Sequence, residues 1–170
     1  MKRIFTLLAI ISCTLLLSAQ EASDDIVKVG DKMPDFSLSS EKYGVIKSGE
    51  FKNKVLLINI FATWCGPCQL ELAEVKKELW PKYKDNPDFV MLTVGREHTD
   101  EELTKYNEKK KFSFPLYPDP KRGFTSKFAV KQIPRTYLVD RNGIIVYMSV
   151  GYKKEAFKDL LKKIEDELDK

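Results

Sequence analysis

Two cysteines, Cys65 and Cys68, are separated by two residues and form the most chemically specific feature of the sequence. At this spacing one thiolate can attack a disulfide of another molecule and the second cysteine can resolve the mixed disulfide. The same spacing also occurs in zinc sites, c-type haem attachment and inert structural disulfides. Zinc needs two further ligands, and outside the first 19 residues the chain has one histidine, His98, and no further cysteine. Haem attachment needs a histidine directly after the second cysteine, where Gln69 stands. The pair therefore predicts redox chemistry, with an inert disulfide as the open alternative.

The cysteine pair lies where a buried strand is expected to become a helix. Residues 55–61 form a continuous apolar run with β-branched side chains, which predicts a central strand buried on both faces. From Cys68 onward, apolar residues recur at helical spacing, and Pro81 is expected to end that helix. The start of a helix favours negative charge. We therefore expect Cys65 to be the exposed, acidic nucleophile and Cys68 to be the shielded resolving cysteine.

The rest of the chain indicates an α/β domain with a mixed central sheet flanked by helices. An edge strand is expected within residues 27–38, turns over 43–54, an extended segment over 114–120 and a short helix within 121–130. Further strands are expected over residues 89–94, 136–139 and 144–150, the last two joined by a hairpin turn at residues 141–143. Helices are expected over 157–168 and over 99–111, where Thr99 and Glu102 match a capping box. His98 stands just before the helix over 99–111 and is expected to be exposed.

The first 19 residues are typical of a secretory signal peptide, with a basic start, an apolar run over residues 4–17 and a small residue before Gln20. An uncleaved membrane anchor is one alternative. Lipoprotein processing at Cys13 is another, because residues 10–13 resemble a lipobox. All three interpretations export the domain. A linker over residues 20–26 and one domain over 27–170 are expected to follow.

Composition excludes several classes of protein. The 170 residues are 43% hydrophobic and 32% charged, which is typical of a folded domain and not of a disordered or coiled-coil chain. Basic residues are spread along the chain, so a nucleic-acid partner is not expected.

The run Phe61–Ala62–Thr63–Trp64–Cys65–Gly66–Pro67–Cys68, followed by Ile133–Pro134, resembles the thioredoxin superfamily, and within it the exported TlpA/ResA-like branch. This resemblance implies a thioredoxin fold with an N-terminal strand extension and a central helix–strand insertion between Cys68 and Pro134. It also implies a cis Pro134 beside the cysteines, with the backbone of Ile133 free to pair with a substrate strand. Trp64, Gly66 and Pro67 are then expected to lie in the substrate contact, with Trp64 packed over the motif.

One residue of the expected site distinguishes this branch from thioredoxin itself. Thioredoxin has a buried aspartate six residues before the first cysteine, where this chain has Asn59. The branch carries a glutamate three residues after the second cysteine, and Glu71 matches it. The resemblance implies that Glu71 exchanges the proton of Cys68; a solvated surface glutamate is the alternative.

These features predict a periplasmic or otherwise extracytoplasmic thiol–disulfide oxidoreductase, and the Gly66–Pro67 dipeptide resembles that of reducing members. Expected partners are protein disulfides or dithiols and a membrane thiol electron donor; no cofactor or metal is expected, and the protein is expected to be a monomer. One alternative is a peroxiredoxin-like peroxidase, although Ala62 and Ile58 stand where that family needs threonine or serine and proline. The other is a non-catalytic module that binds client chains through Ile133–Pro134. Arg135 is expected to add positive potential near Cys65, to contact an acidic partner, or simply to lie at the surface.

Overall fold

The computed structural model describes residues 24–170, so the expected leader lies outside the described residues. A five-stranded sheet forms the middle of the domain, in the order β5-β4-β3-β6-β7. The central strand β3 is parallel to β4 and antiparallel to β6, and every residue of β3 is buried, as the apolar run predicts. The strands are β3 (Val55–Phe61), β4 (Phe89–Arg96), β5 (Leu116–Asp119), β6 (Arg135–Val139) and β7 (Ile145–Val150).

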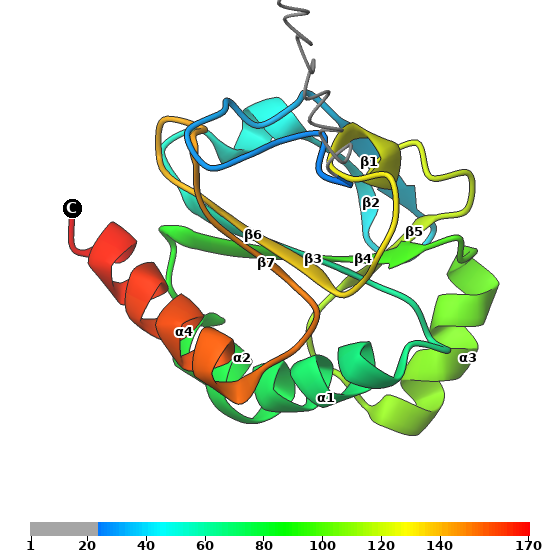
Figure 1. Cartoon of the computed structure of the whole chain (residues 1–170). Helices are drawn as coiled ribbons and strands as arrows, with labels where there is room; N and C mark the ends of the chain where they lie inside the picture. The colour runs from blue at the N-terminus through cyan, green and yellow to red at the C-terminus, as the bar shows by residue number, and fades with distance from the viewer. Residues whose placement is uncertain (1–23) are drawn as a thin grey trace, which may run out of the picture.

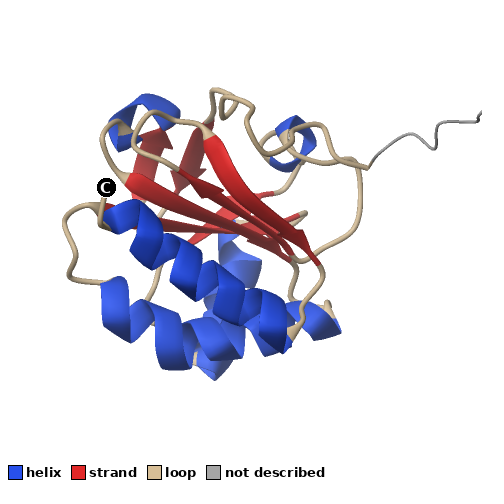
Figure 2. Ribbon diagram, turned by 60° about the vertical axis from the view of Figure 1, so that its left-hand side comes forward, coloured by secondary structure: helices blue, strands red, loops and turns tan. Residues whose placement is uncertain are grey.

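Helices cover one face of this sheet, and the other face is covered mainly by the N-terminal segment (Figures 1 and 2). The helical face carries α1 (Gly66–Glu74), α3 (Asp100–Lys110) and α4 (Lys154–Leu168). The opposite face carries an antiparallel hairpin of β1 (Ser37–Ser40) and β2 (Gly44–Lys47), and the short 3₁₀ helices η1 (Ser48–Phe51) and η3 (Thr125–Lys127). This arrangement is the thioredoxin fold, with the expected N-terminal strand extension and an insertion that contains α3 and β5.

The expectation that Pro81 ends the first helix is wrong. The chain continues from α1 through a π-helical segment, η2 (Val75–Leu79), into α2 (Trp80–Tyr83), which contains Pro81 in its first turn. In the π segment the N–H of Trp80 reaches the carbonyl of Val75, five residues back. The wider turn accommodates a proline, which has no N–H and would collide with an α-helical carbonyl four residues earlier.

Other local predictions are confirmed. Thr99 and Glu102 form a capping box at the start of α3. Gly143 has a φ of +81° in the turn between β6 and β7. The extended segment becomes strand β5, and the short helix predicted after it is the 3₁₀ helix η3.

The first described residues pack beside the loop that leads to β6. The N–H of Ile26 donates to the carbonyl of Phe128, and the N–H of Val130 donates to the carbonyl of Asp24. Residues 24–26, within the segment expected to be a linker, are thus hydrogen-bonded to the domain. Within residues 24–170, no helix is both long and apolar enough to cross a membrane.

Candidate active site

Cys65 and Cys68 form a disulfide at the start of α1, with their Cα atoms 5.3 Å apart. Cys65 is the N-cap residue, and its Sγ accepts a hydrogen bond of 3.2 Å from the N–H of Cys68. The same N–H would stabilise the Cys65 thiolate after reduction, together with the positive end of the helix. Gly66 begins the helix and Pro67 follows in the first turn, where no N–H is needed.

Exposure of the two cysteines follows the expected order but not the expected degree. Cys68 is fully buried, whereas Cys65 keeps 6% of its surface exposed in the disulfide form. Cys65 is thus less exposed than the sequence suggests, because its Sγ is bonded to Cys68 and lies 3.8 Å from the carbonyl oxygen of Ile133. Of the two cysteines, only Cys65 keeps any surface that a partner could reach.

The loop before β6 faces Cys65, as the resemblance implies. The Ile133–Pro134 peptide bond is cis. Pro134 is buried and Ile133 is partly exposed, so the backbone of Ile133 borders the disulfide at the surface. The structure therefore brings together the cysteine motif and the Ile133–Pro134 segment, both singled out in the sequence, and they meet at the Sγ of Cys65.

Trp64, Gly66 and Pro67 lie on the exposed rim of the disulfide. Trp64 leaves 66% of its surface in solvent, so the expected packing over the motif does not bury the ring. Phe61 and Ala62 fill the core below this loop instead. An exposed indole beside Cys65 is available to an apolar partner.

Glu71 is buried, so the alternative of a solvated surface glutamate is wrong. Its carboxylate accepts hydrogen bonds from Asn59 Nδ2 at 2.7 Å and from Thr136 Oγ1 at 2.8 Å. Burial raises the pKa of the Glu71 carboxyl, and the hydrogen bonds from Thr136 and Asn59 oppose that rise. Cys68 and Glu71 are three residues apart on α1, a spacing that places both on one side of the helix.

Arg135 is buried, and its positive charge is paired with an aspartate instead of being free beside Cys65. Its side chain is 1% exposed and forms an ion pair with Asp25 in the N-terminal segment. Its Nε donates to the carbonyls of Lys131 and Gln132, at 3.0 Å and 3.1 Å. Tertiary contacts turn Arg135 inward, where it connects the segment before Ile133 to the first described residues.

His98 is buried, which contradicts the expectation of an exposed side chain. Its Nε2 accepts a hydrogen bond of 3.0 Å from the N–H of Thr63, in the loop that leads to Cys65. Gln69 also donates to the carbonyl of Thr63, and the Tyr106 hydroxyl donates to Gln69. None of these three residues belongs to the site predicted from the sequence. The capping box beside His98 is the one sequence signal that locates it at a helix start near the sheet.

Comparison with known proteins agrees with this geometry. The Redoxin family model matches residues 28–164. The chain belongs to the Redoxin family. It is 26% identical over 144 residues to the thiol-disulfide oxidoreductase ResA of Bacillus thuringiensis, covering 84% of this chain and 82% of ResA.

Two solved structures show the same fold. A candidate protein disulfide isomerase from Bacteroides thetaiotaomicron superposes with a TM-score of 0.83 at 30% identity, covering 86% of this chain and 94% of that one. A candidate thiol:disulfide interchange protein DsbE from Chlorobium tepidum superposes with a TM-score of 0.75 at 29% identity, covering 84% and 99%. This member of the Redoxin family is a thiol–disulfide oxidoreductase of the ResA/DsbE type. Within residues 24–170, no cluster of three or more histidine, cysteine or acidic side chains is arranged to hold a metal.

Proposed function

We propose that this protein is an extracytoplasmic reductant of protein disulfides that acts through the Cys65–Gly66–Pro67–Cys68 dithiol. The observation that supports it best is the position of the Cys65 sulfur, at a helix start and next to the Ile133 carbonyl. A substrate strand that pairs with the backbone of Ile133 would bring its own disulfide to this sulfur. The apolar leader expected from the sequence supports an extracytoplasmic location.

The reaction moves two electrons from the dithiol to the substrate. The Cys65 thiolate attacks one substrate sulfur, which forms a mixed disulfide and releases the other substrate sulfur as a thiolate. Cys68 then loses its proton and attacks the Cys65 sulfur, which releases the second substrate sulfur and forms the Cys65–Cys68 disulfide. A thiol electron donor at the membrane would return the pair to the reduced form.

Glu71 is the proton acceptor for Cys68 in this proposal. It is buried, it follows Cys68 by three residues on α1, and two donors hold its carboxylate. Glu71 also lines a narrow pocket between the end of β7 and the start of α4, together with Gly151 and Tyr152. The proton would be taken up inside the domain, because water does not surround the buried carboxylate.

Turnover and trapping test the proposal together. The reduced protein should reduce the disulfides of insulin catalytically with a dithiol donor, and the Cys65→Ser variant should not. Cys68→Ser should accumulate mixed disulfides with protein substrates, because the resolving thiol is absent, whereas Cys65→Ser should accumulate almost none. Absence of turnover in the parent would instead indicate a module that only binds client chains. Equal trapping by both variants would overturn the assigned order of attack.

A further inference from the structure

Both backbone polar groups of Thr63 are held by side chains from outside its loop. The N–H donates to His98 Nε2 at 3.0 Å, and the carbonyl accepts from Gln69 Nε2 at 3.0 Å. The amide oxygen of Gln69 in turn accepts from the hydroxyl of Tyr106 at 2.7 Å. We call His98, Gln69 and Tyr106 the Thr63 clamp.

Glu102 fixes the form of His98 that can accept this hydrogen bond. A neutral imidazole has one acceptor nitrogen and one N–H, so acceptance at Nε2 requires the proton on Nδ1. Nδ1 lies 3.4 Å from Glu102 Oε2, which also accepts from the N–H of Thr99 at 2.9 Å. The carboxylate that caps α3 therefore also selects the tautomer of His98 that binds Thr63.

The segment that carries His98 and Tyr106 is itself held firmly against the sheet. Glu97, directly before His98, has a φ of +61°, which turns the chain sharply between β4 and α3. Gly95 lets α3 come close, since a Cβ there would lie 2.7 Å from Leu103 Cδ2.

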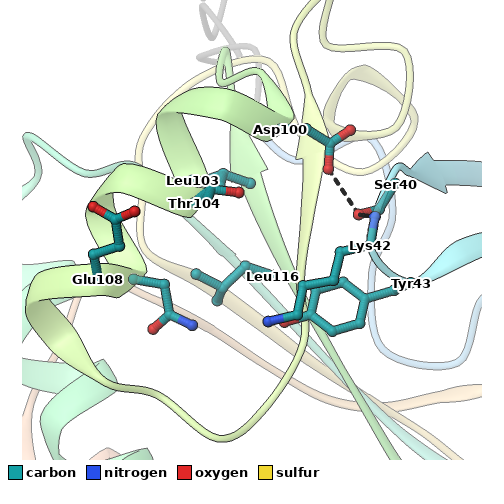
Figure 3. Close-up of a pocket in the computed structure, with 9 residues that line it drawn as sticks. Ser40, Lys42, Tyr43, Asp100, Leu103, Thr104, Glu108 and Leu116 are labelled. Atoms are coloured by element: carbon teal, nitrogen blue, oxygen red, sulfur yellow. Dashed lines mark hydrogen bonds between the residues drawn. The ribbon is translucent and has the colours of Figure 1, made fainter.

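A second contact fastens α3 from the side of the β1–β2 hairpin. Asp100 accepts from Ser40 Oγ at 2.7 Å and from the N–H of Glu41 at 3.2 Å. Figure 3 shows the Ser40–Asp100 bond at one end of a pocket of about 200 Å³ between the hairpin and α3. The clamp thus connects the cysteine loop to a helix that is fixed on two sides.

We propose that His98, together with Tyr106 acting through Gln69, positions Cys65 for attack on a disulfide. Thr63 lies two residues before Cys65, and the N–H of Cys65 donates to the carbonyl of Ala62 at 3.2 Å. Fixing Thr63 therefore fixes the helix start at which the Cys65 sulfur meets the N–H of Cys68 and faces Ile133. The inference rests on the proposed function for its role in turnover, because a displaced sulfur would approach a substrate disulfide poorly.

Two substitutions of His98 separate positioning from packing. His98→Leu fills the space but removes the acceptor, whereas His98→Gln keeps an acceptor at the end of the side chain. The first readout is amide hydrogen exchange at Thr63 in the disulfide form. The second is the rate constant of the reaction of the Cys65 thiolate with glutathione disulfide, measured in Cys68→Ser proteins and corrected for the thiolate fraction.

We expect His98→Leu to raise Thr63 exchange and to lower the rate constant, each by about three- to tenfold, which corresponds to one lost hydrogen bond. His98→Gln should restore both values to within about twofold of the parent. The control is Glu101→Gln, because Glu101 lies on the exposed side of α3, pairs only with Lys105 among the described residues, and should change neither readout.

Parent-like values in His98→Leu would overturn the proposal, and so would equal impairment of His98→Gln and His98→Leu at equal melting temperature. If His98→Leu does not fold, Tyr106→Phe decides, because it removes the donor to Gln69 and keeps the ring next to Phe61. It should lower the rate constant by about threefold, and an unchanged rate constant would overturn the proposal. Neither readout uses a protein substrate, so a parent that reduces no protein disulfide would overturn the proposed function without deciding the clamp.

Discussion

The side-chain amide of Asn59, in the central strand β3, donates a 2.7 Å hydrogen bond to the carboxylate of Glu71, in the helix that carries both cysteines. Thr136 in β6 supplies a second donor at 2.8 Å, so strand, helix and neighbouring strand meet at one buried carboxyl group. Thioredoxin itself has its acid at the strand position. In this protein the strand supplies an amide, and the acid comes from the helix next to Cys68.

Replacement of Glu71 by Gln should slow resolution of the mixed disulfide. The change keeps the size and polarity of the side chain but removes the proton acceptor. We expect the resolution rate at neutral pH to fall by about 10²-fold, with a smaller effect on the initial attack by Cys65. Stopped-flow measurement on a preformed mixed disulfide between pH 5 and 9 tests this.

The matched control is Glu74→Gln, the same change one turn further along α1. It should follow the parent curve. A Glu71→Gln curve that coincides with the parent throughout would show that solvent accepts the Cys68 proton.

Stability should also depend on pH through Glu71. Burial raises its pKa above the ordinary value of 4.5, so between these two values the folded state binds a proton that the unfolded state has released. The stabilisation is therefore fully present below about pH 4.5 and is lost as pH rises through the folded-state pKa. Denaturant unfolding of the oxidised protein at a series of pH values should show this loss, and Glu71→Gln should show a smaller one. Parallel pH curves for the two proteins would contradict the prediction.

Substitution of Arg135 by Met should loosen the loop before Ile133. It removes the ion pair with Asp25 and the donors to the carbonyls of Lys131 and Gln132. Since the Asp25 side chain remains 30% exposed, solvent can take over part of its pairing. We therefore expect a loss of about 2 kcal/mol in the free energy of unfolding, below the range for a fully buried pair. The KM for a protein disulfide should rise more than kcat falls.

The control for Arg135 is Lys131→Met, which removes an exposed ion pair to Asp24. That change should alter the free energy of unfolding by less than about 0.5 kcal/mol. Equal stability of the two variants would show that the buried guanidinium does not hold the loop.

Gly95→Ala should affect both stability and the cysteine loop. The added methyl group would lie 2.7 Å from Leu103 Cδ2, so α3 or Leu103 must shift. Overpacking of this kind costs about 1–3 kcal/mol. Because α3 carries Tyr106 and follows His98, Thr63 amide exchange should increase as well. Gly49→Ala, with no atom within 4 Å of the added Cβ, is the control and should leave Thr63 exchange unchanged.

Much of this protein can be predicted from local sequence. The apolar run of residues 55–61 predicts a strand buried on both faces, since a strand between two covered faces has no position that must be polar. Every residue of β3 is indeed buried. The cysteine spacing at the strand–helix junction predicts the disulfide at the helix start, since a motif of four consecutive residues sets its own geometry. The capping box at Thr99 and the turn at Gly143 are likewise decided by neighbours in the chain.

Only the tertiary structure decided which polar side chains are buried around the cysteines. His98, Arg135 and Glu71 have side chains that are usually solvated, and each is buried because a partner far away in the sequence satisfies its polar atoms. No local pattern identifies those partners: Thr63 lies 35 residues before His98, and Asp25 lies 110 residues before Arg135. The sequence determined which sulfur atoms can react, through spacing within one turn of helix. The fold decided which distant groups hold them, because burial of a polar group depends on what the folded chain brings beside it.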